Sequence, residues 1–244
     1  MDWTKAKTIL IVALLITNLF LLTTFIFVKA DDRPTEEMLL SETIELLEAK
    51  NIYIDTELPT KHNKMPILSV EYDRLDQNLL QEQLWSQIPL NQGQRSTENI
   101  LNMTEDFLRK CDIWRDTAVL DRIENEEGII KVYYKNVYEN YLIEDSYIIC
   151  TVEDGQVTEI DRYWLNPVNF GKTKKATMSA SAALINFMSE KNEMGSILVE
   201  DMEMVYWLDS AVYGTETTIS DTAFPAWKIT YNDGQIKHIP AYNE

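Results

Sequence analysis

Two histidines and two cysteines are the residues in this chain best suited to catalysis or to binding a transition metal. They are His62, Cys111, Cys150 and His238, and none of them lies near another in the sequence. The chain has no His-Glu-x-x-His pair, no Gly-x-Ser-x-Gly turn, no phosphate-binding glycine loop and no Cys-x-x-Cys pair. We therefore predict no catalytic, cofactor-binding or metal-binding residues, and a protein that is not an enzyme.

Each of these four residues has a structural explanation instead. His62 lies in a polar linker and His238 in a predicted strand near the C-terminus, and a lone histidine is more often structural than catalytic. Cys111 and Cys150 could form a disulfide in an oxidising compartment, or they could be two buried thiols. The sequence leaves both states of the cysteines open.

Acidic side chains are so abundant that adjacent pairs arise by chance. The chain has 40 acidic residues, including the pairs Asp31–Asp32 and Glu126–Glu127. None of the acidic stretches has the glycine and the ligand spacing of a calcium loop, and a glycosidase needs two carboxylates in one defined cleft. We therefore interpret these acids as solvated surface.

An uncharged segment near the N-terminus determines how the rest of the chain is positioned relative to a membrane. Residues 8–28 contain no charged side chain, and Lys5, Lys7 and Lys29 flank them. About 20 apolar residues in a helix cross the hydrocarbon core of a bilayer, whereas the apolar region of a cleaved signal peptide has about 7–15. The length predicts a retained helix, with residues 1–29 forming a cytoplasmic tail and a transmembrane anchor.

The charges flanking this helix determine its orientation only weakly. Two lysines precede it, and Lys29 and Arg33 follow it, so the positive-inside rule is balanced. A short N-terminal tail is easily kept in the cytoplasm while a long C-terminal part is translocated. We predict a single-pass protein of the cell membrane with a cytoplasmic N-terminus and an extracytoplasmic C-terminal domain. Cleavage after a signal peptide, near residues 28–30, is the alternative.

The part of the chain beyond the anchor is strongly acidic. It contains 39 acidic and 19 basic residues, because residues 1–29 hold one aspartate and three lysines, so its net charge is −20. Such a surface repels nucleic-acid backbones and anionic lipid headgroups, and we predict no nucleic-acid partner. The content of aliphatic and aromatic residues predicts a folded domain rather than a disordered one.

One side of the predicted anchor carries small and polar residues. Ala13, Thr17 and Thr24 recur at helical spacing, and Asn18 lies beside them near the middle of the membrane. Small residues allow two helices to approach closely, and Thr or Asn can hydrogen-bond between helices. We predict that these four residues bind the transmembrane region of a partner. The alternative is an isolated helix whose polar side chains bond to their own backbone.

Periodicity divides the rest of the chain into helices and strands joined by short turns. Helical spacing predicts helices over 35–50, 77–87, 97–110 and 177–190. Alternation predicts strands over 51–55, 66–73, 118–123, 129–138, 141–153, 157–164, 197–208, 226–232 and 236–242. Asp154-Gly155 and Asp233-Gly234 predict hairpin turns, and 167–175 is predicted to be a loop between two parts of the fold.

The order of these elements indicates an internal repeat. A helix followed by antiparallel strands occurs twice, starting at residues 97 and 177. We predict an α+β fold: one N-terminal transmembrane helix, then an ectodomain of two related halves, each an antiparallel sheet with a helix packed on one face. The halves are predicted to span residues 30–165, nearer the membrane, and 166–244, distal to it.

Aromatic residues provide the best candidates for contacts made by the ectodomain. Tyr134, Tyr138 and Tyr141 flank a corner between two strands, and we predict that they are partly exposed and contact a partner. The tryptophans either line a glycan- or peptide-binding cleft or pack in the core: Trp85, Trp114, Trp164, Trp207 and Trp227. Exposed edge strands offer a further contact mode, by strand addition.

Several segments resemble a known family. They are Met1-Asp2-Trp3-Thr4-Lys5-Ala6-Lys7-Thr8-Ile9 running into an apolar helix with Asn18-Leu19-Phe20, then residues 66–72, the corner 138–143 and the strand 225–231. Together they resemble YycI, a membrane-anchored regulatory protein of low-GC Gram-positive bacteria, and the last strand is similar to the closing strand of PepSY-like domains. Asn140 departs from the glycine expected at that corner, although asparagine tolerates a left-handed backbone.

The resemblance implies a function that composition and spacing do not supply. YycI-like proteins, with a similarly anchored companion called YycH, associate with the sensor histidine kinase of the WalKR (YycGF) two-component system, which controls cell-wall metabolism. It implies a non-enzymatic regulator that modulates the kinase through contacts between membrane helices. Two alternatives share the fold: a wall-associated or peptide-binding module, and a PepSY-like inhibitor of a protease.

Overall fold

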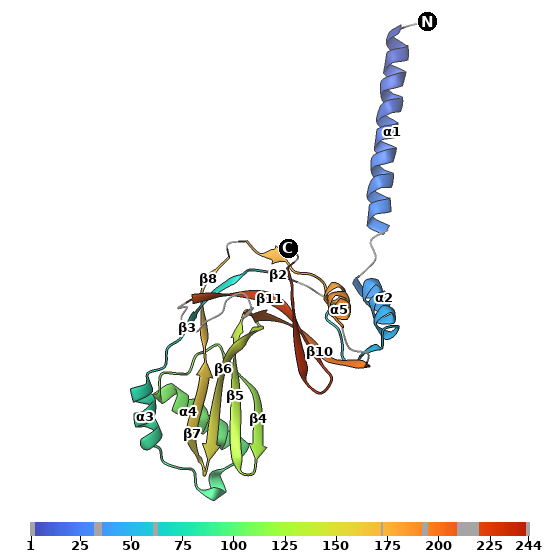
Figure 1. Cartoon of the computed structure of the whole chain (residues 1–244). Helices are drawn as coiled ribbons and strands as arrows, with labels where there is room; N and C mark the ends of the chain where they lie inside the picture. The colour runs from blue at the N-terminus through green and yellow to red at the C-terminus, as the bar shows by residue number, and fades with distance from the viewer. Residues whose placement is uncertain are drawn as a thin grey trace.

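The first helix stands apart from the rest of the molecule in the computed structural model of the chain (Figure 1). The structure describes residues 3–31, 36–60, 63–171, 173–191, 195–208 and 220–242. Helix α1 (Trp3–Asp31) contains an 18-residue window, Lys7–Thr24, that is long and apolar enough to cross a membrane, and none of that window is buried against the domain. The apolar side chains of this window therefore have no partner within the part of the fold that the structure describes.

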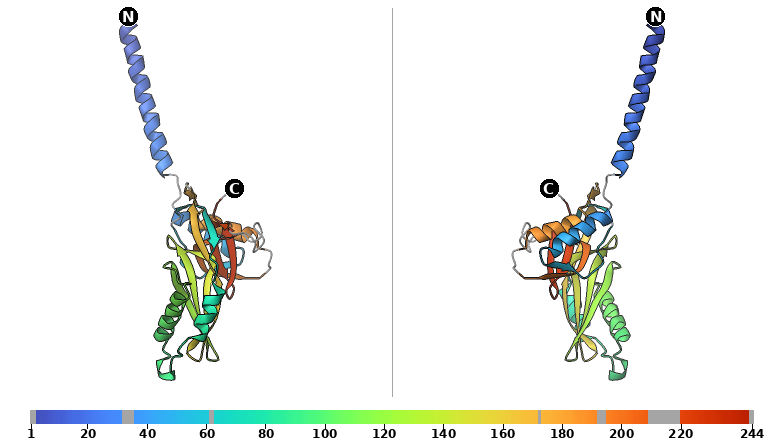
Figure 2. Two further views of the ribbon diagram at one scale, coloured as in Figure 1. Left: turned by 90° about the vertical axis from the view of Figure 1, so that its left-hand side faces the viewer. Right: turned by 90° about the vertical axis from the view of Figure 1, so that its right-hand side faces the viewer.

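The part of the domain nearest to α1 is a sheet covered on one face by two helices. Helices α2 (Glu36–Glu48) and α5 (Ala180–Ser189) lie side by side over strands β10 (Ile197–Trp207), β11 (Ser220–Tyr231) and β12 (Gln235–Pro240) (Figure 2). Strand β1 (Ile52–Ile54) pairs in parallel with β10. The helices and strands bury one apolar core, which includes Leu47, Leu184 and Trp227.

The other part of the domain is a four-stranded meander with two helices. Strands β4 (Ala118–Glu126), β5 (Ile129–Tyr138), β6 (Tyr141–Glu153) and β7 (Gln156–Tyr163) pair with their sequence neighbours. Helix α4 (Thr97–Lys110) packs on one face, and α3 (Gln77–Trp85) and the 3₁₀ turn η1 (Gln92–Gln94) lie beside it. This end of the molecule lies farthest from α1 (Figures 1 and 2).

The turns of the meander have the backbone geometry that their residues favour. Asp154 and Gly155 both have positive φ, as a tight hairpin requires. Asn140 has a φ of 71° at the corner between β5 and β6, so asparagine there supports the turn in place of glycine. Ser96 begins α4 by accepting a hydrogen bond from the backbone N–H of Asn99 at 3.3 Å.

A third group of strands joins the two parts into one sheet of ten strands among the described residues. Strand β3 (Leu68–Tyr72) pairs with β11 and with β8 (Leu165–Phe170), and β6 meets β10 through the parallel pair Ile143–Tyr206. A separate two-stranded ladder is formed by β2 (Lys64–Met65) and β9 (Lys175–Ala176). The predicted α+β class with one N-terminal apolar helix is confirmed.

The structure corrects the expected loop at 167–175, because its first residues belong to β8. Pro167 lacks a backbone N–H, but β8 is an edge strand at the end of the sheet, where a missing donor is tolerated. The packing also differs from a division at residue 165. Helix α2 and strand β1 precede that point, yet they pack on α5 and β10 of the C-terminal part.

Candidate partner-binding surfaces

The four residues predicted to bind within the membrane all lie on the exposed surface of α1, but their polar groups differ. Thr17 donates its hydroxyl hydrogen to the carbonyl of Ala13 at 2.9 Å, and Thr24 donates to the carbonyl of Phe20 at 2.6 Å. The carboxamide of Asn18 has no hydrogen-bond partner among the described residues. The threonines are therefore satisfied within the helix, whereas Asn18 is not.

Helical geometry places these residues in two groups. Successive residues are rotated by about 100°, so Ala13, Thr17 and Thr24 form one stripe within about 40° of each other. Asn18 lies about 100° from Thr17 around the same helix. One neighbouring helix packed against the small-residue stripe would thus leave the Asn18 carboxamide to a different neighbour.

Tyr134 is buried, so the prediction of partial exposure at this residue is wrong. Only 3% of it is exposed, its hydroxyl is 2.7 Å from the Thr104 hydroxyl, and its ring meets Trp114 edge-on at 5.3 Å. Burial raises the pKa of Tyr134 to about 12. Alternation along β5 explains why Tyr134 is buried, because Val132 and Tyr134 lie on the same face of the strand and pack in the core beneath α4.

Tyr138 and Tyr141 are half-buried at the corner between β5 and β6. Both rings approach the ring of Tyr206, with centroid distances of 5.9 and 6.3 Å, and the Tyr141 hydroxyl accepts a hydrogen bond from Asn63 at 2.7 Å. Tyr206 itself is fully buried, so the outer two rings cover the junction of β6 and β10. A partner contact at Tyr138 and Tyr141 stays a prediction.

A network of charged side chains crosses four strands near that junction, and the sequence analysis missed it. Lys228 of β11 lies 3.1 Å from Glu144 of β6 and 3.2 Å from Glu203 of β10. Lys135 of β5 donates to the backbone carbonyl of Glu144 at 2.8 Å. Burial opposes the charge of Lys228, but the two glutamates outweigh it and raise the pKa of Lys228. These residues lie far apart in the sequence, so no local sequence pattern predicts their contacts.

A groove of about 560 Å³ opens beside this network. Tyr72, Tyr147 and Tyr163 line it with the carboxylates of Asp145 and Asp221. Asp145 accepts a hydrogen bond from the backbone N–H of Leu208 at 3.1 Å, yet burial still raises the pKa of Asp145. The groove is therefore aromatic and acidic, which is unfavourable for an anionic ligand.

His238 lies at the edge of this groove, stacked on Trp207 with ring centroids 5.1 Å apart. Its Nε2 atom is buried without a hydrogen-bond partner among the described residues. Burial lowers the pKa of His238, and although Glu144 opposes the shift, Lys228 and Lys135 add to it. The neutral imidazole is thus the form that the fold favours. His62 lies outside the described residues.

Replacing His238 with glutamine is expected to remove part of the loss of stability in mild acid. Because the folded-state pKa is below the unfolded value of about 6.5, the unfolded chain takes up a proton first as the pH falls through that value. Wild-type stability should therefore decrease below about pH 6.5, and stability above it should not depend on this titration. Urea unfolding of both proteins at pH 7.5 and pH 5.5 measures the difference. An identical acid-side loss in both would contradict the expectation.

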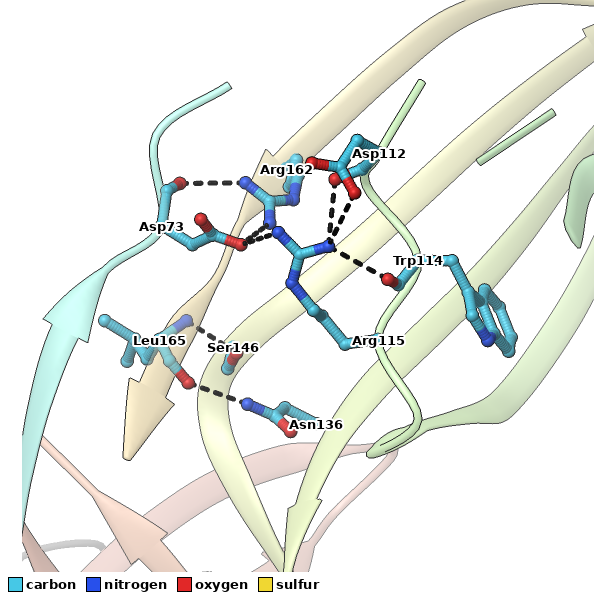
Figure 3. Close-up of polar contacts among 8 residues, drawn as sticks. All are labelled: Asp73, Asp112, Trp114, Arg115, Asn136, Ser146, Arg162 and Leu165. Atoms are coloured by element: carbon cyan, nitrogen blue, oxygen red, sulfur yellow. Dashed lines mark hydrogen bonds and ion pairs between the residues drawn. The ribbon is translucent and has the colours of Figure 1, made fainter. Parts of the chain in front are cut away.

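Asp73 is the centre of a second buried polar cluster, which fastens the helical end of the domain to the sheet (Figure 3). Its Oδ2 atom accepts hydrogen bonds from Arg162 at 2.5 Å and from Arg115 at 2.8 Å, and its backbone carbonyl accepts another from Arg162 at 2.8 Å. Arg115 also donates to the carbonyls of Asp112 and Trp114. The cluster joins the end of β3, the loop after α4 and strand β7.

Both cysteines are free and buried in the core beneath α4. Burial raises the pKa of Cys111 to about 11 and that of Cys150 as well. Thiols held in this way are poor nucleophiles and poor metal ligands. Within the part of the chain that the structure describes, no group of three or more His, Cys, Asp or Glu side chains could hold a metal ion.

Comparison with known proteins decides the family. A family model described as YycI protein matches residues 36–242, from the start of α2 to the end of the described chain. This chain belongs to the YycI family. The match includes both parts of the sheet, and it confirms the resemblance seen in the sequence. The YycI family is a regulatory family, and membership indicates a regulator of the WalKR two-component system.

Other comparisons add little to that assignment. No curated protein matches this chain. Among solved structures, the Bacillus megaterium YpeB C-terminal domain is similar, with 12% sequence identity and a TM-score of 0.36 over 64% of this chain. The match also covers 64% of that domain, so the chain spans somewhat less than two thirds of it.

Proposed function

We propose that this protein is a non-enzymatic, membrane-anchored regulator that binds and modulates the sensor histidine kinase of the WalKR system. Helix α1 binds the transmembrane region of the kinase, together with a YycH-like single-pass protein. The N-terminus lies in the cytoplasm, and the domain beyond α1 lies outside the cell membrane. Family membership supports the choice of system, and the orphan carboxamide of Asn18 supports α1 as the binding element.

The physical argument for α1 rests on the cost of a polar group in hydrocarbon. A carboxamide in the bilayer core has no water to bond to, so it is stabilised when a neighbouring helix supplies a donor or an acceptor. Every side chain in the Lys7–Thr24 window is exposed, so the domain cannot supply that partner. Asn18 therefore favours association with another membrane helix.

The two groups of residues on α1 suit two neighbours. The stripe of Ala13, Thr17 and Thr24 allows a close approach of one helix, and Asn18 presents hydrogen-bonding groups about 100° away to a second. A kinase helix and the helix of a YycH-like protein would occupy these two sides. Residues 32–35 alone separate α1 from α2, so displacement of α1 is coupled over a short distance to the domain.

Exchange of the anchor tests this function directly. Full-length tagged protein is compared with a version in which α1 is replaced by an unrelated transmembrane helix, and membranes are solubilised for co-purification. Recovery of the kinase and of a second single-pass protein is expected only with the native α1, because the binding groups lie there. Equal recovery with the foreign helix would overturn the proposal, and it would place binding in the ectodomain, as a peptide-binding module or a protease inhibitor requires.

A further inference from the structure

The end of the domain farthest from α1 contains a pocket that the proposed regulatory function does not use. It has a volume of about 440 Å³ and lies between α3, η1 and α4, which are far from the membrane anchor in both views (Figures 1 and 2). Pockets of 300–1,000 Å³ commonly hold small molecules or parts of polymers. We propose that this pocket binds an uncharged N-acetylated saccharide chain.

The rim of the pocket carries primary amides with unused hydrogen-bonding capacity. The side chains of Gln83 and Asn102 have no hydrogen-bond partner among the described residues. Asn99 uses only its Nδ2 atom, which donates to the carbonyl of Gln94 at 2.9 Å, and Gln94 uses only its Oε1 atom, which accepts from Asn91 at 3.3 Å. The rim therefore offers free donors and free acceptors to one ligand.

The floor of the pocket is apolar. Phe107 and Met103 project from α4, and Leu90 joins them from the preceding loop. A ligand with hydroxyl and acetamido groups on its edges and C–H groups on its faces complements this combination. The acetamido group supplies one donor, one acceptor and a methyl group, which suit the amide rim and the apolar floor together.

The loop that forms one wall is held rigidly against the meander. The Gln87 carboxamide donates to the carbonyl of Val157 at 2.8 Å and accepts from its N–H at 2.9 Å. Arg95 donates to the carbonyl of Asp154 at 2.7 Å. A Cβ on Gly155 would lie only 2.4 Å from the carbonyl oxygen of Leu90, so the loop and the hairpin are in close contact. A preformed wall lowers the entropic cost of binding.

One large apolar side chain that lines the pocket is almost fully exposed. Ile88 is 90% exposed, so it is available for contact with a ligand and does not support the core. The net charge of −20 on the chain beyond residue 29 disfavours phosphate-bearing polymers. One acid and one base, Asp106 and Lys110, also line the pocket, so its lining has no net charge and suits an uncharged ligand.

Binding of a defined oligosaccharide tests the inference, which rests on the proposed function only for the extracytoplasmic location. Full-length protein in lipid nanodiscs, free of sugar detergents, is titrated calorimetrically with the β-1,4 tetramer of N-acetylglucosamine. Cellotetraose, which has the same linkage without acetamido groups, is the matched ligand control, and a neutral tetrapeptide is the second. Binding of the acetylated tetramer alone is the expected result.

Two variants locate the site. Ile88→Ala and Asn102→Ala are each expected to weaken binding about tenfold, because each removes a contact with the ligand while leaving the core intact. Tyr53→Ala, at an exposed aromatic residue on β1, is the control and should bind like wild type. Absence of binding, unchanged affinity in both variants, or binding of the peptide instead would overturn the inference. Exchange of α1 leaves this binding intact, so the two proposals fail independently.

Discussion

Replacement of Asn18 with leucine is expected to reduce co-purification of the sensor kinase or its single-pass companion with the full-length protein. The carboxamide of Asn18 has no partner among the described residues, and an interhelical hydrogen bond in a membrane contributes about 0.6–1.7 kcal/mol. Its loss corresponds to roughly a 3- to 18-fold weaker association. Insertion should be unaffected, because leucine is favourable in the bilayer core.

Variants at other positions around α1 are the controls for this experiment. Leu19→Ala changes a residue on the side of the helix away from both groups and should leave recovery unchanged. Thr17→Leu places a bulky side chain on the small-residue stripe and should reduce recovery of the other neighbour. Quantitative blotting of the co-purified proteins against membrane-inserted bait measures each effect. Unchanged recovery of both partners with Asn18→Leu would show that this residue does not bind them.

Replacement of Asp73 with alanine is expected to destabilise the domain by about 3–5 kcal/mol. The carboxylate forms ion pairs with two guanidinium groups, and the side chain of Arg162 is only 3% exposed while that of Asp73 is 16% exposed. Removing it leaves two like charges close together and partly buried. Burial lowers the pKa of Arg162, and the hydrogen bond and the charge of Asp73 oppose that shift.

The neighbouring aspartate provides a control of the same type. Asp76 caps α3 by accepting hydrogen bonds from the N–H groups of Asn78 and Leu79, and its replacement with alanine should cost only about 1 kcal/mol. Thermal unfolding should show a decrease of about 6–20 °C for Asp73→Ala and a few degrees for Asp76→Ala. Equal effects of the two variants would contradict a special role for the buried cluster.

The Asp73 cluster also connects stability with the distal end of the domain. It joins the residues just before α3 to the loop just after α4, and these two helices form the amide-lined pocket. Variants that weaken the cluster are therefore unsuitable for testing saccharide binding, because they would loosen both walls at once. Ile88 and Asn102 are exposed and avoid this problem.

Features of the chain that depend on neighbouring residues were predictable from the sequence. The long apolar helix follows from a run of uncharged residues, and the meander follows from alternation between turns whose residues accept positive φ. The family resemblance came from short segments in their order along the chain, and the family match confirms it. In each case the information lies within a few residues of the feature itself.

Features that depend on distant residues were decided by the tertiary structure. The parallel pairing of β1 with β10 joins Ile52 to Ile197, and the Asp73 cluster brings in Arg162, so no local pattern encodes either contact. Alternation along β5 divides its residues between two faces, but only the packing of α4 decides that Tyr134 lies on the buried one. The sequence by itself determined the long apolar helix, the class of fold and the family. Long-range packing decided which polar side chains are buried together and which remain free to bind, because burial depends on every element that covers a residue.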